Sequence, residues 1–291
     1  MAEKVRTSPE GSVCSPSQIA HRTARVISHN QIADKTFRIR LDCPDLSSRA
    51  LPGQFAMVRL PDRSDPLLAR PLAIYDTYED GTCVDFIYLV HGKFTTCLKD
   101  VPPGENLTIW GPLGNGFNPR PADHLILVAG GIGYTALLSL GRERLGRAKY
   151  GFPARTAPRA RKVTFCWGAR HGGLFGDTDD FQDAGIDMHY ATQDGSIGHK
   201  GTVVDLLERI HIGEPEKCHV ACCGPEPMMA AVSKWTERHA ITCDVSLEEP
   251  MACGIGICFT CVAKIRDNSS EWDYRRTCIE GPVFDSASIV W

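Results

Sequence analysis

The chain has 291 residues and a mass of 32.0 kDa, a length that suits two or three compact units rather than one. Hydrophobic residues make up 43% and charged residues 23%, which excludes a disordered chain. The net charge of −3 lacks the basic excess of a nucleic-acid binder, and no apolar run approaches the roughly 20 residues that cross a bilayer. We therefore expect neither a nucleic-acid nor a membrane partner. The first residues lack the apolar core of a signal peptide, which predicts a cytoplasmic location.

The residues up to about 118 predict a tail followed by short strands. Residues 1–21 are rich in Ser, Pro and charge, which is typical of a flexible tail. Phe37, Ile39 and Leu41 alternate with arginines, and further strands are expected at 55–60, 84–90 and 107–110. Turn signals separate these strands. Residues 22–118 therefore predict an antiparallel β-barrel or sandwich.

Residues 119–242 change to strands that alternate with helices. Apolar runs recur at 125–129, 163–167, 188–191 and 219–222, with helical patterns at 134–145, 203–210 and after Pro227. This alternation predicts an α/β domain with a parallel sheet. The basic, proline-containing segment 142–161 is expected to be a surface insertion. Asp177, Asp179 and Asp180 indicate the start of a helix, where the dipole favours acidic side chains.

Thirteen cysteines in a chain without an export signal point to thiols rather than disulfides. Most are expected to be ordinary core or surface thiols, because they lack the spacing of ligands: Cys14, Cys43, Cys83, Cys97, Cys166, Cys218 and Cys243.

The last unit, residues 243–291, contains cysteines with a different spacing. Cys253, Cys258 and Cys261 form C-x4-C-x2-C, and Cys278 follows, which is the plant-type pattern for a 2Fe–2S cluster. Structural zinc is the alternative, although zinc sites usually use two separate knuckles. A unit of some fifty residues rarely sustains a core by itself, so a cluster would also hold it together.

Three glycine-containing turns follow predicted strands. They are Gly130-Gly131-Ile132-Gly133, the segment 195–201, and Cys223-Gly224-Pro225. Glycines at the carboxyl ends of strands let a phosphate approach the backbone, so the turns together predict a dinucleotide site. Arg70, followed by Pro71, could grip a pyrophosphate through its planar guanidinium, although an Arg-Pro pair alone is weak evidence.

The order of these motifs resembles the ferredoxin reductase superfamily. Arg-Pro-x-x-Ile, Gly-Gly-Ile-Gly and Cys-Gly-Pro-x-Pro-Met occur in its usual sequence. Residues 246–261 and 278–285 further resemble the electron-transfer subunit of type B dihydroorotate dehydrogenase, and the resemblance extends from about residue 22 to the end.

The resemblance implies FAD in the barrel, NADH on the α/β domain and a 2Fe–2S cluster held by the four cysteines. It implies a redox relay in pyrimidine biosynthesis that requires no acid or base from this chain. The implied partner is an FMN-containing dihydroorotate dehydrogenase catalytic subunit, in a hetero-oligomer with two copies of each. The implied FAD contacts are Arg70, Pro71, Leu72, Ala73, Ile87, Tyr88, Leu89, Gly92, Phe94 and Thr95. The implied nicotinamide contacts are Gly131, Gly133, Cys223 and Gly224.

Some positions depart from the family pattern. Ala73 stands where Ser is common, Leu89 where Arg is usual, and Phe94 where Gly is usual. Glu248 and Glu249 precede the cluster loop and are expected on a solvated face or at a partner contact.

Three alternatives for the function stay open at this point: a reductase subunit of a hydrogenase or ferredoxin complex, a redox sensor without turnover, and a zinc-stabilised interaction domain.

Overall fold

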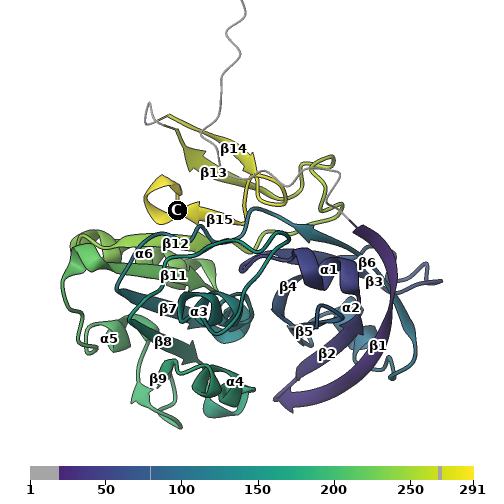
Figure 1. Cartoon of the computed structure of the whole chain (residues 1–291), viewed down its shortest axis with the longest axis horizontal. Coiled ribbons are helices and arrows are strands. Elements are labelled where there is room, and N and C mark those ends of the chain that lie inside the picture. The colour runs from purple at the N-terminus through teal and green to yellow at the C-terminus, as the bar shows by residue number, and fades with distance from the viewer. Residues whose placement is uncertain (1–19, 79, 268–270) are drawn as a thin grey trace, which may run out of the picture.

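The computed structural model describes residues 20–78, 80–267 and 271–291. The predicted tail, apart from its last two residues, and Cys14 lie outside the described residues. A barrel and a parallel sheet with helices lie side by side, and the C-terminal segment runs across both of them (Figure 1). Within the described ranges, no helix is both long and apolar enough to span a membrane.

The barrel is closed and wholly antiparallel, in the strand order β1-β2-β5-β4-β3-β6. Its interior is filled by the alternate apolar side chains of the strands, among them Ile39 and Leu41 of the predicted alternation. Two short helices accompany it. The elements are β1 (Ala20–Ala33), β2 (Thr36–Asp42), α1 (Pro44–Arg49), β3 (Phe55–Arg59), β4 (Arg70–Thr77), β5 (Cys83–Leu89), α2 (Lys93–Leu98) and β6 (Asn106–Leu113).

The second sheet has seven strands in the order β10-β9-β8-β7-β11-β12-β15, parallel except for β15. Helices cover both faces. Leu125 and Leu127 of β7 pack on one face, and Ile126 and Val128 pack on the other, which explains the continuous apolar run. The elements are β7 (His124–Gly130), η2 (Gly131–Ala136), α3 (Leu138–Arg144), β8 (Lys162–Ala169), η3 (Gly172–Leu174), α4 (Thr178–Asp183), β9 (Asp187–Thr192), β10 (His199–Lys200), α5 (Val203–Leu207), η4 (Pro215–Lys217), β11 (Cys218–Cys223) and α6 (Glu226–Arg238).

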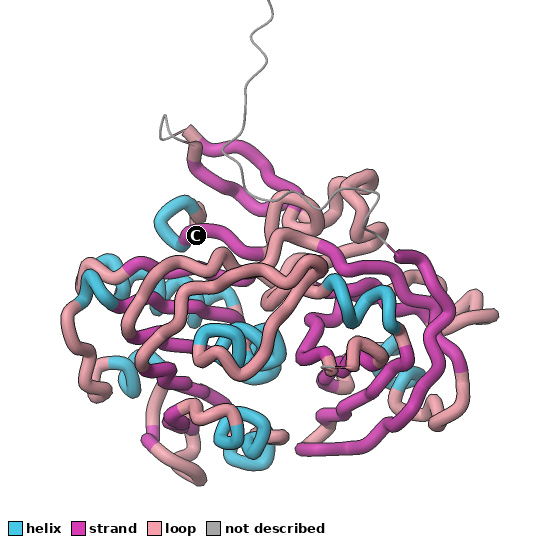
Figure 2. Tube along the Cα trace, viewed as in Figure 1, coloured by secondary structure: helices cyan, strands magenta, loops and turns pink. Residues whose placement is uncertain are grey.

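The C-terminal segment is divided between the sheet and a loop-rich unit of its own (Figure 2). Strands β12 (Thr242–Ser246) and β15 (Val283–Asp285) extend the parallel sheet. Strands β13 (Val262–Arg266) and β14 (Trp272–Arg276) form a separate antiparallel pair, and η5 (Ser286–Ser288) follows β15. The predicted boundary between residues 242 and 243 therefore falls within β12.

The glycine turn after β7 leads into a tighter element than the sequence predicts. Instead of one helix over 134–145, η2 is a 3-10 helix and α3 begins only at Leu138. Gly131 has a left-handed φ of +53°, and Gly133 lies against the backbone of Cys223. The chain therefore leaves the strand in a tight turn, because the neighbouring strand allows no wider path.

The expectation of a surface insertion over 142–161 holds for much of that segment, but a few of its side chains are buried. Arg144 is completely buried and donates to the carbonyl oxygens of Pro158 and Ala122. Arg155 forms a two-pronged ion pair with buried Glu143, with N···O distances of 2.7 and 2.6 Å. The charges of Arg144, Arg155 and Glu143 are compensated by protein groups rather than by solvent, a possibility that composition alone does not reveal.

The same segment joins the α/β domain to the barrel. Arg142 pairs with Asp76 of β4, and the Tyr150 hydroxyl donates to the same carboxylate at 2.8 Å. Arg38 of β2 contacts Asp177 and Asp180 at the start of α4, at 2.9 and 2.7 Å. The predicted helix start at these aspartates is confirmed, but their carboxylates also pair with the neighbouring domain.

Candidate functional site

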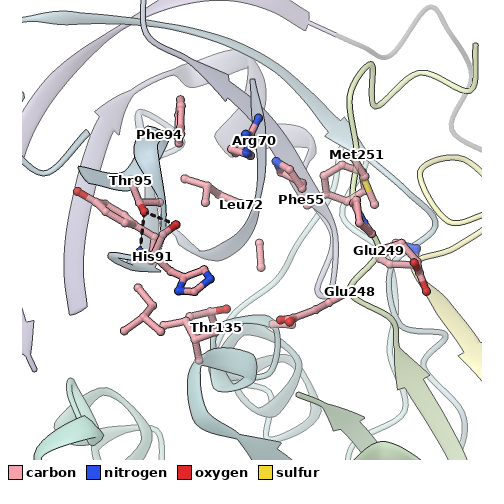
Figure 3. Close-up of a pocket in the computed structure, with 18 of the residues that line it drawn as sticks. Phe55, Arg70, Leu72, His91, Phe94, Thr95, Thr135, Glu248, Glu249 and Met251 are labelled. Atoms are coloured by element: carbon pink, nitrogen blue, oxygen red, sulfur yellow. Dashed lines mark hydrogen bonds between the residues drawn. The ribbon is translucent and has the colours of Figure 1, made fainter. Parts of the chain in front are cut away.

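A cavity of about 780 Å³ opens between the barrel, η2 and the segment that follows β12 (Figure 3). Its volume lies in the range of ligand sites. All ten residues that the resemblance implies for FAD line it: Arg70, Pro71, Leu72, Ala73, Ile87, Tyr88, Leu89, Gly92, Phe94 and Thr95. They come from β4, β5 and the loop into α2, which converge because these strands are neighbours in the barrel.

Arg70 supplies positive charge to this cavity. It stands at the start of β4 with an exposed side chain, and its Nη1 donates to the carbonyl oxygens of Leu68 and Ala69. Among the described residues, no carboxylate forms an ion pair with it. Apolar side chains such as Leu72 and Phe55 line the cavity nearby (Figure 3). An unpaired guanidinium beside an apolar wall fits a ligand with a pyrophosphate and a flat ring.

Tyr88 lines the cavity, but it is 2% exposed and packs in the barrel core, where its hydroxyl is engaged. The hydroxyl lies 2.7 Å from Nε2 of His29, whose Nδ1 lies 2.7 Å from the Val101 carbonyl oxygen. Because a carbonyl oxygen only accepts, Nδ1 carries the proton and Tyr88 donates to Nε2. Burial lowers the pKa of His29, which keeps the ring in this neutral form. His29 therefore fixes the orientation of Tyr88. No motif in the sequence singles out His29 for this role.

All three departures from the family pattern, Ala73, Leu89 and Phe94, line the cavity. Phe94 is 2% exposed and packs in the barrel core, with Arg70 above its ring at 6.0 Å. Thr95 accepts from the His91 amide at 2.7 Å and donates to the His91 carbonyl oxygen. The large side chain of Phe94 thus points into the barrel core, and the loop keeps its hydrogen bonds.

The residues implied for the nicotinamide separate into two groups. Cys223 lines the cavity, whereas Gly131, Gly133 and Gly224 do not. A Cβ on Gly133 would lie 2.3 Å from the Cys223 carbonyl oxygen, so this glycine permits close packing of two strand ends. Gly131 has open space around its missing side chain. The three glycines shape the backbone behind the cavity wall, and Cys223 belongs to the wall itself.

Glu248 faces Cys223 across the junction with the cluster segment. Its Oε1 lies 4.0 Å from the Cys223 sulfur, and the carboxylate points towards Thr135 in Figure 3. The side chain is open to the cavity, but the surrounding protein still raises the pKa of the carboxyl group. Burial also raises the pKa of Cys223 well above its usual value. Glu248 is therefore exposed, as expected, but on the wall of an open cavity.

The four predicted ligands approach one another as two pairs. Cys258 is hydrogen-bonded to Cys253, and Cys278 is hydrogen-bonded to Cys261. Thr260 donates to the Cys258 sulfur at 3.0 Å, and such bonds lower the pKa of this exposed thiol to about 6. Burial raises the pKa of Cys278 to about 12.

This pairing fits a two-iron group, in which each iron takes two of the four thiolates. In the described part of the chain, no three His, Cys, Asp or Glu side chains are grouped around a single metal ion. The left-handed Gly254 and Gly256 let the loop wrap between its first two cysteines.

The cysteine loop, which we define as residues 251–261, forms part of the cavity wall. Met251, Ala252 and Thr260 line the cavity, and Met251 packs in one cluster with Cys261, Cys278 and the barrel residue Phe55. The Trp110 indole donates to the Cys253 carbonyl oxygen at 3.1 Å. A cofactor in the cavity and a metal group in the loop would therefore be immediate neighbours.

Comparison with known proteins supports this arrangement. A family described as the iron–sulfur cluster binding domain of dihydroorotate dehydrogenase B matches residues 248–290, and an oxidoreductase NAD-binding domain matches residues 127–234. The chain is similar to a solved structure described as NADH-dependent reduced ferredoxin-NADP oxidoreductase, with a TM-score of 0.76, 25% identity, and 92% and 90% of the two chains covered. A ferredoxin reductase of carbazole 1,9a-dioxygenase, at 17% identity and a TM-score of 0.65, shares the fold over 77% of this chain and 67% of its own.

Curated relatives cover nearly the whole chain. Proteins of Desulforamulus reducens and Geobacillus kaustophilus are 34% and 33% identical over 92% and 94% of this chain, and over 97% and 99% of their own lengths. A protein of Clostridium acetobutylicum is 36% identical over 82% of this chain and 86% of its own. All three are named dihydroorotate dehydrogenase B (NAD(+)), electron transfer subunit. The chain therefore belongs to the family of electron transfer subunits of dihydroorotate dehydrogenase B.

Proposed function

We propose that this chain carries electrons between an FMN-containing dihydroorotate dehydrogenase catalytic subunit and NAD, as its relatives' names indicate, in pyrimidine biosynthesis. The observation that carries the proposal is the shared wall: Met251, Ala252 and Thr260 belong to the cysteine loop and also line the cavity. Two redox groups held on either side of that wall would exchange electrons without a moving part.

The site residues are assigned by their position. FAD would be held by Arg70 at its pyrophosphate and by the strand residues of the cavity around its ring system. NADH would approach the turn of Gly131 and Gly133, beside Cys223 and Gly224. The 2Fe–2S cluster would be held by Cys253, Cys258, Cys261 and Cys278. The corresponding units would be residues 22–118, 119–242 and 243–291, of which the last shares β12 with the sheet.

The chemistry comes from the cofactors, and the chain positions them. A bound flavin supplies the conversion between hydride exchange, which moves two electrons, and single-electron exchange with the cluster. Arg70 orients the ligand, Tyr88 and Leu72 provide its apolar surroundings, and the thiolates with Thr260 set the charge around the irons.

We place the electron exit at the outer edge of the cysteine loop. Cys258 is exposed there, and Ile257 and Phe259 beside it are 72% and 62% exposed. An apolar rim of this kind suits a protein partner, here the FMN subunit. Assembly with two copies of each subunit, and a cytoplasmic location, remain part of the proposal.

The test is an anaerobic visible spectrum with iron, sulfide and flavin analysis, before and after NADH. The proposal requires flavin and two irons per chain, and rapid bleaching of the flavin by NADH. It further requires that dihydroorotate-dependent NADH formation appears only when the FMN subunit is added. Slow or absent bleaching would indicate a redox sensor, a colourless zinc protein would indicate an interaction domain, and transfer only to a ferredoxin or hydrogenase would indicate another complex.

A further inference from the structure

The proposed reaction leaves a proton without an obvious carrier. Oxidation of NADH to NAD⁺ yields two electrons and one proton, and only the electrons can leave through an iron–sulfur cluster. The proton must leave the cavity through a titratable side chain or water. Because this proton arises only in the proposed function, its acceptor rests on that function and must be sought among the side chains of this cavity.

Most titratable side chains of the cavity wall are unsuited to this role. The Arg70 guanidinium only donates hydrogen bonds and has no atom that accepts a proton. The Tyr88 hydroxyl is bonded to His29, and its pKa is raised by burial. Lys93 pairs with Asp65. Burial raises the pKa of Cys223 far enough to keep it a neutral thiol. The remaining lining groups are His91, Glu248 and Glu249.

Glu248 is distinguished from the other two by its position. It contacts Cys223, at the end of β11, and it lies on the segment that leads five residues later to Cys253. In Figure 3 its carboxylate points into the cavity towards Thr135, whereas Glu249 lies farther from Thr135 and His91 belongs to the barrel loop. Glu248 therefore lies between the proposed nicotinamide side and the cluster.

The surroundings of Glu248 favour reversible protonation. The groups facing it are the Cys223 thiol and, across the cavity, Thr135 and His91, with Glu249 adjacent in the chain. No Lys, Arg or His of the described residues forms an ion pair with it, so no cation fixes it as a carboxylate. Its exposure to the open cavity leaves a path to solvent.

We propose that Glu248 accepts the proton released when NADH is oxidised in the cavity and passes it to solvent. The carboxylate becomes a carboxylic acid as the two electrons leave through the cluster, and it loses the proton to water at the cavity mouth. In the opposite direction, the same group takes a proton from water and supplies it for the reduction of NAD⁺. Charge is then balanced in the cavity without any other side chain changing its state.

The test compares Glu248→Gln with the native holoprotein, because glutamine keeps the shape but cannot titrate. NADH is mixed anaerobically with excess one-electron acceptor and a pH-indicator dye. We expect flavin bleaching within twofold of native, but at least a tenfold slower proton release and acceptor reduction. The flavin midpoint potential plotted against pH should bend at the pKa of Glu248 in the native protein and lose that bend in Glu248→Gln.

Three further variants make the result decisive. Glu248→Asp should restore the bend and most of the proton release, since it restores a carboxyl group. Glu249→Gln should keep the native bend. The inference is overturned if Glu248→Gln releases protons at the native rate and keeps the bend, or if His91→Gln abolishes both instead. Failure of NADH to bleach the native flavin would instead refute the proposed function.

Discussion

Gly133 gives a sharp test of the proposed nicotinamide site. In Gly133→Ala the new Cβ would lie 2.3 Å from the Cys223 carbonyl oxygen and 2.7 Å from the Gly224 nitrogen. Both neighbours are backbone atoms, so no rotamer change relieves the contact. The two turns must separate by at least about 0.7 Å to reach the 3.0 Å that real Cβ contacts respect. A displacement near 1 Å in a positioned site costs up to about 100-fold, so we expect NADH to reduce the flavin roughly 10- to 100-fold less efficiently.

The assay is the rate of flavin bleaching at several NADH concentrations, with flavin and iron content measured in the same samples. Both contents should stay native, because the atoms nearest to the new methyl group belong to Cys223 and Gly224 rather than to the barrel or the cysteine loop. Gly213→Ala is the matched control, since a Cβ there meets nothing within 4 Å. If NADH bleached the flavin of Gly133→Ala at a rate within twofold of native, at normal flavin content, the reasoning would be refuted.

Three other outcomes are expected. Cys258→Ser should lose at least half the iron and the visible absorbance of the cluster, whereas the buried non-ligand variant Cys166→Ser should keep both in the same metal analysis. Arg155→Met leaves the Glu143 side chain, which is 3% exposed, without its cation. The free energy of unfolding, measured in urea, should fall by about 3–5 kcal/mol. The double variant with Glu143→Leu should recover most of that loss, and a double variant without recovery would contradict a buried ion pair. Although the Glu248 side chain is open to the cavity, desolvation by the surrounding protein raises the folded pKa of its carboxyl group above the usual 4.5, so its ionised form opposes folding at high pH. Glu248→Gln should therefore raise the melting temperature at about pH 8 but not at about pH 4, and an equal effect at both would contradict that sign.

The contacts between barrel and α/β domain explain how the two cofactor sites could keep a fixed separation. Domains in one chain move relative to one another unless their interface is extensive. Here Arg38, Arg142 and Tyr150 tie β2 and β4 to α4 and the 142–161 segment through carboxylates. The cysteine loop adds apolar packing against the barrel. The barrel, the α/β domain and the cysteine loop, which together line the cavity, are thus held in fixed positions by contacts with one another.

The proposed ligand set and the strand pattern could be predicted because they depend on short-range constraints. C-x4-C-x2-C restricts the first three sulfurs to one loop whatever the rest of the chain does. The apolar run of β7 has the composition of a strand buried on both faces, and its burial confirms that interpretation. Strands β1, β13 and β14 were not predicted, because they carry many polar residues and their stability comes from pairing with partners distant in the sequence.

Contacts between segments that are far apart in the chain follow from tertiary packing alone. Glu248 contacts Cys223 because β12 lies beside β11 in the sheet, and Arg142 meets Asp76 because two domains are packed together. Cys278 lies beside Cys261 because β13 pairs with β14. Such contacts depend on how whole elements pack, and local periodicity and spacing carry no information about that packing.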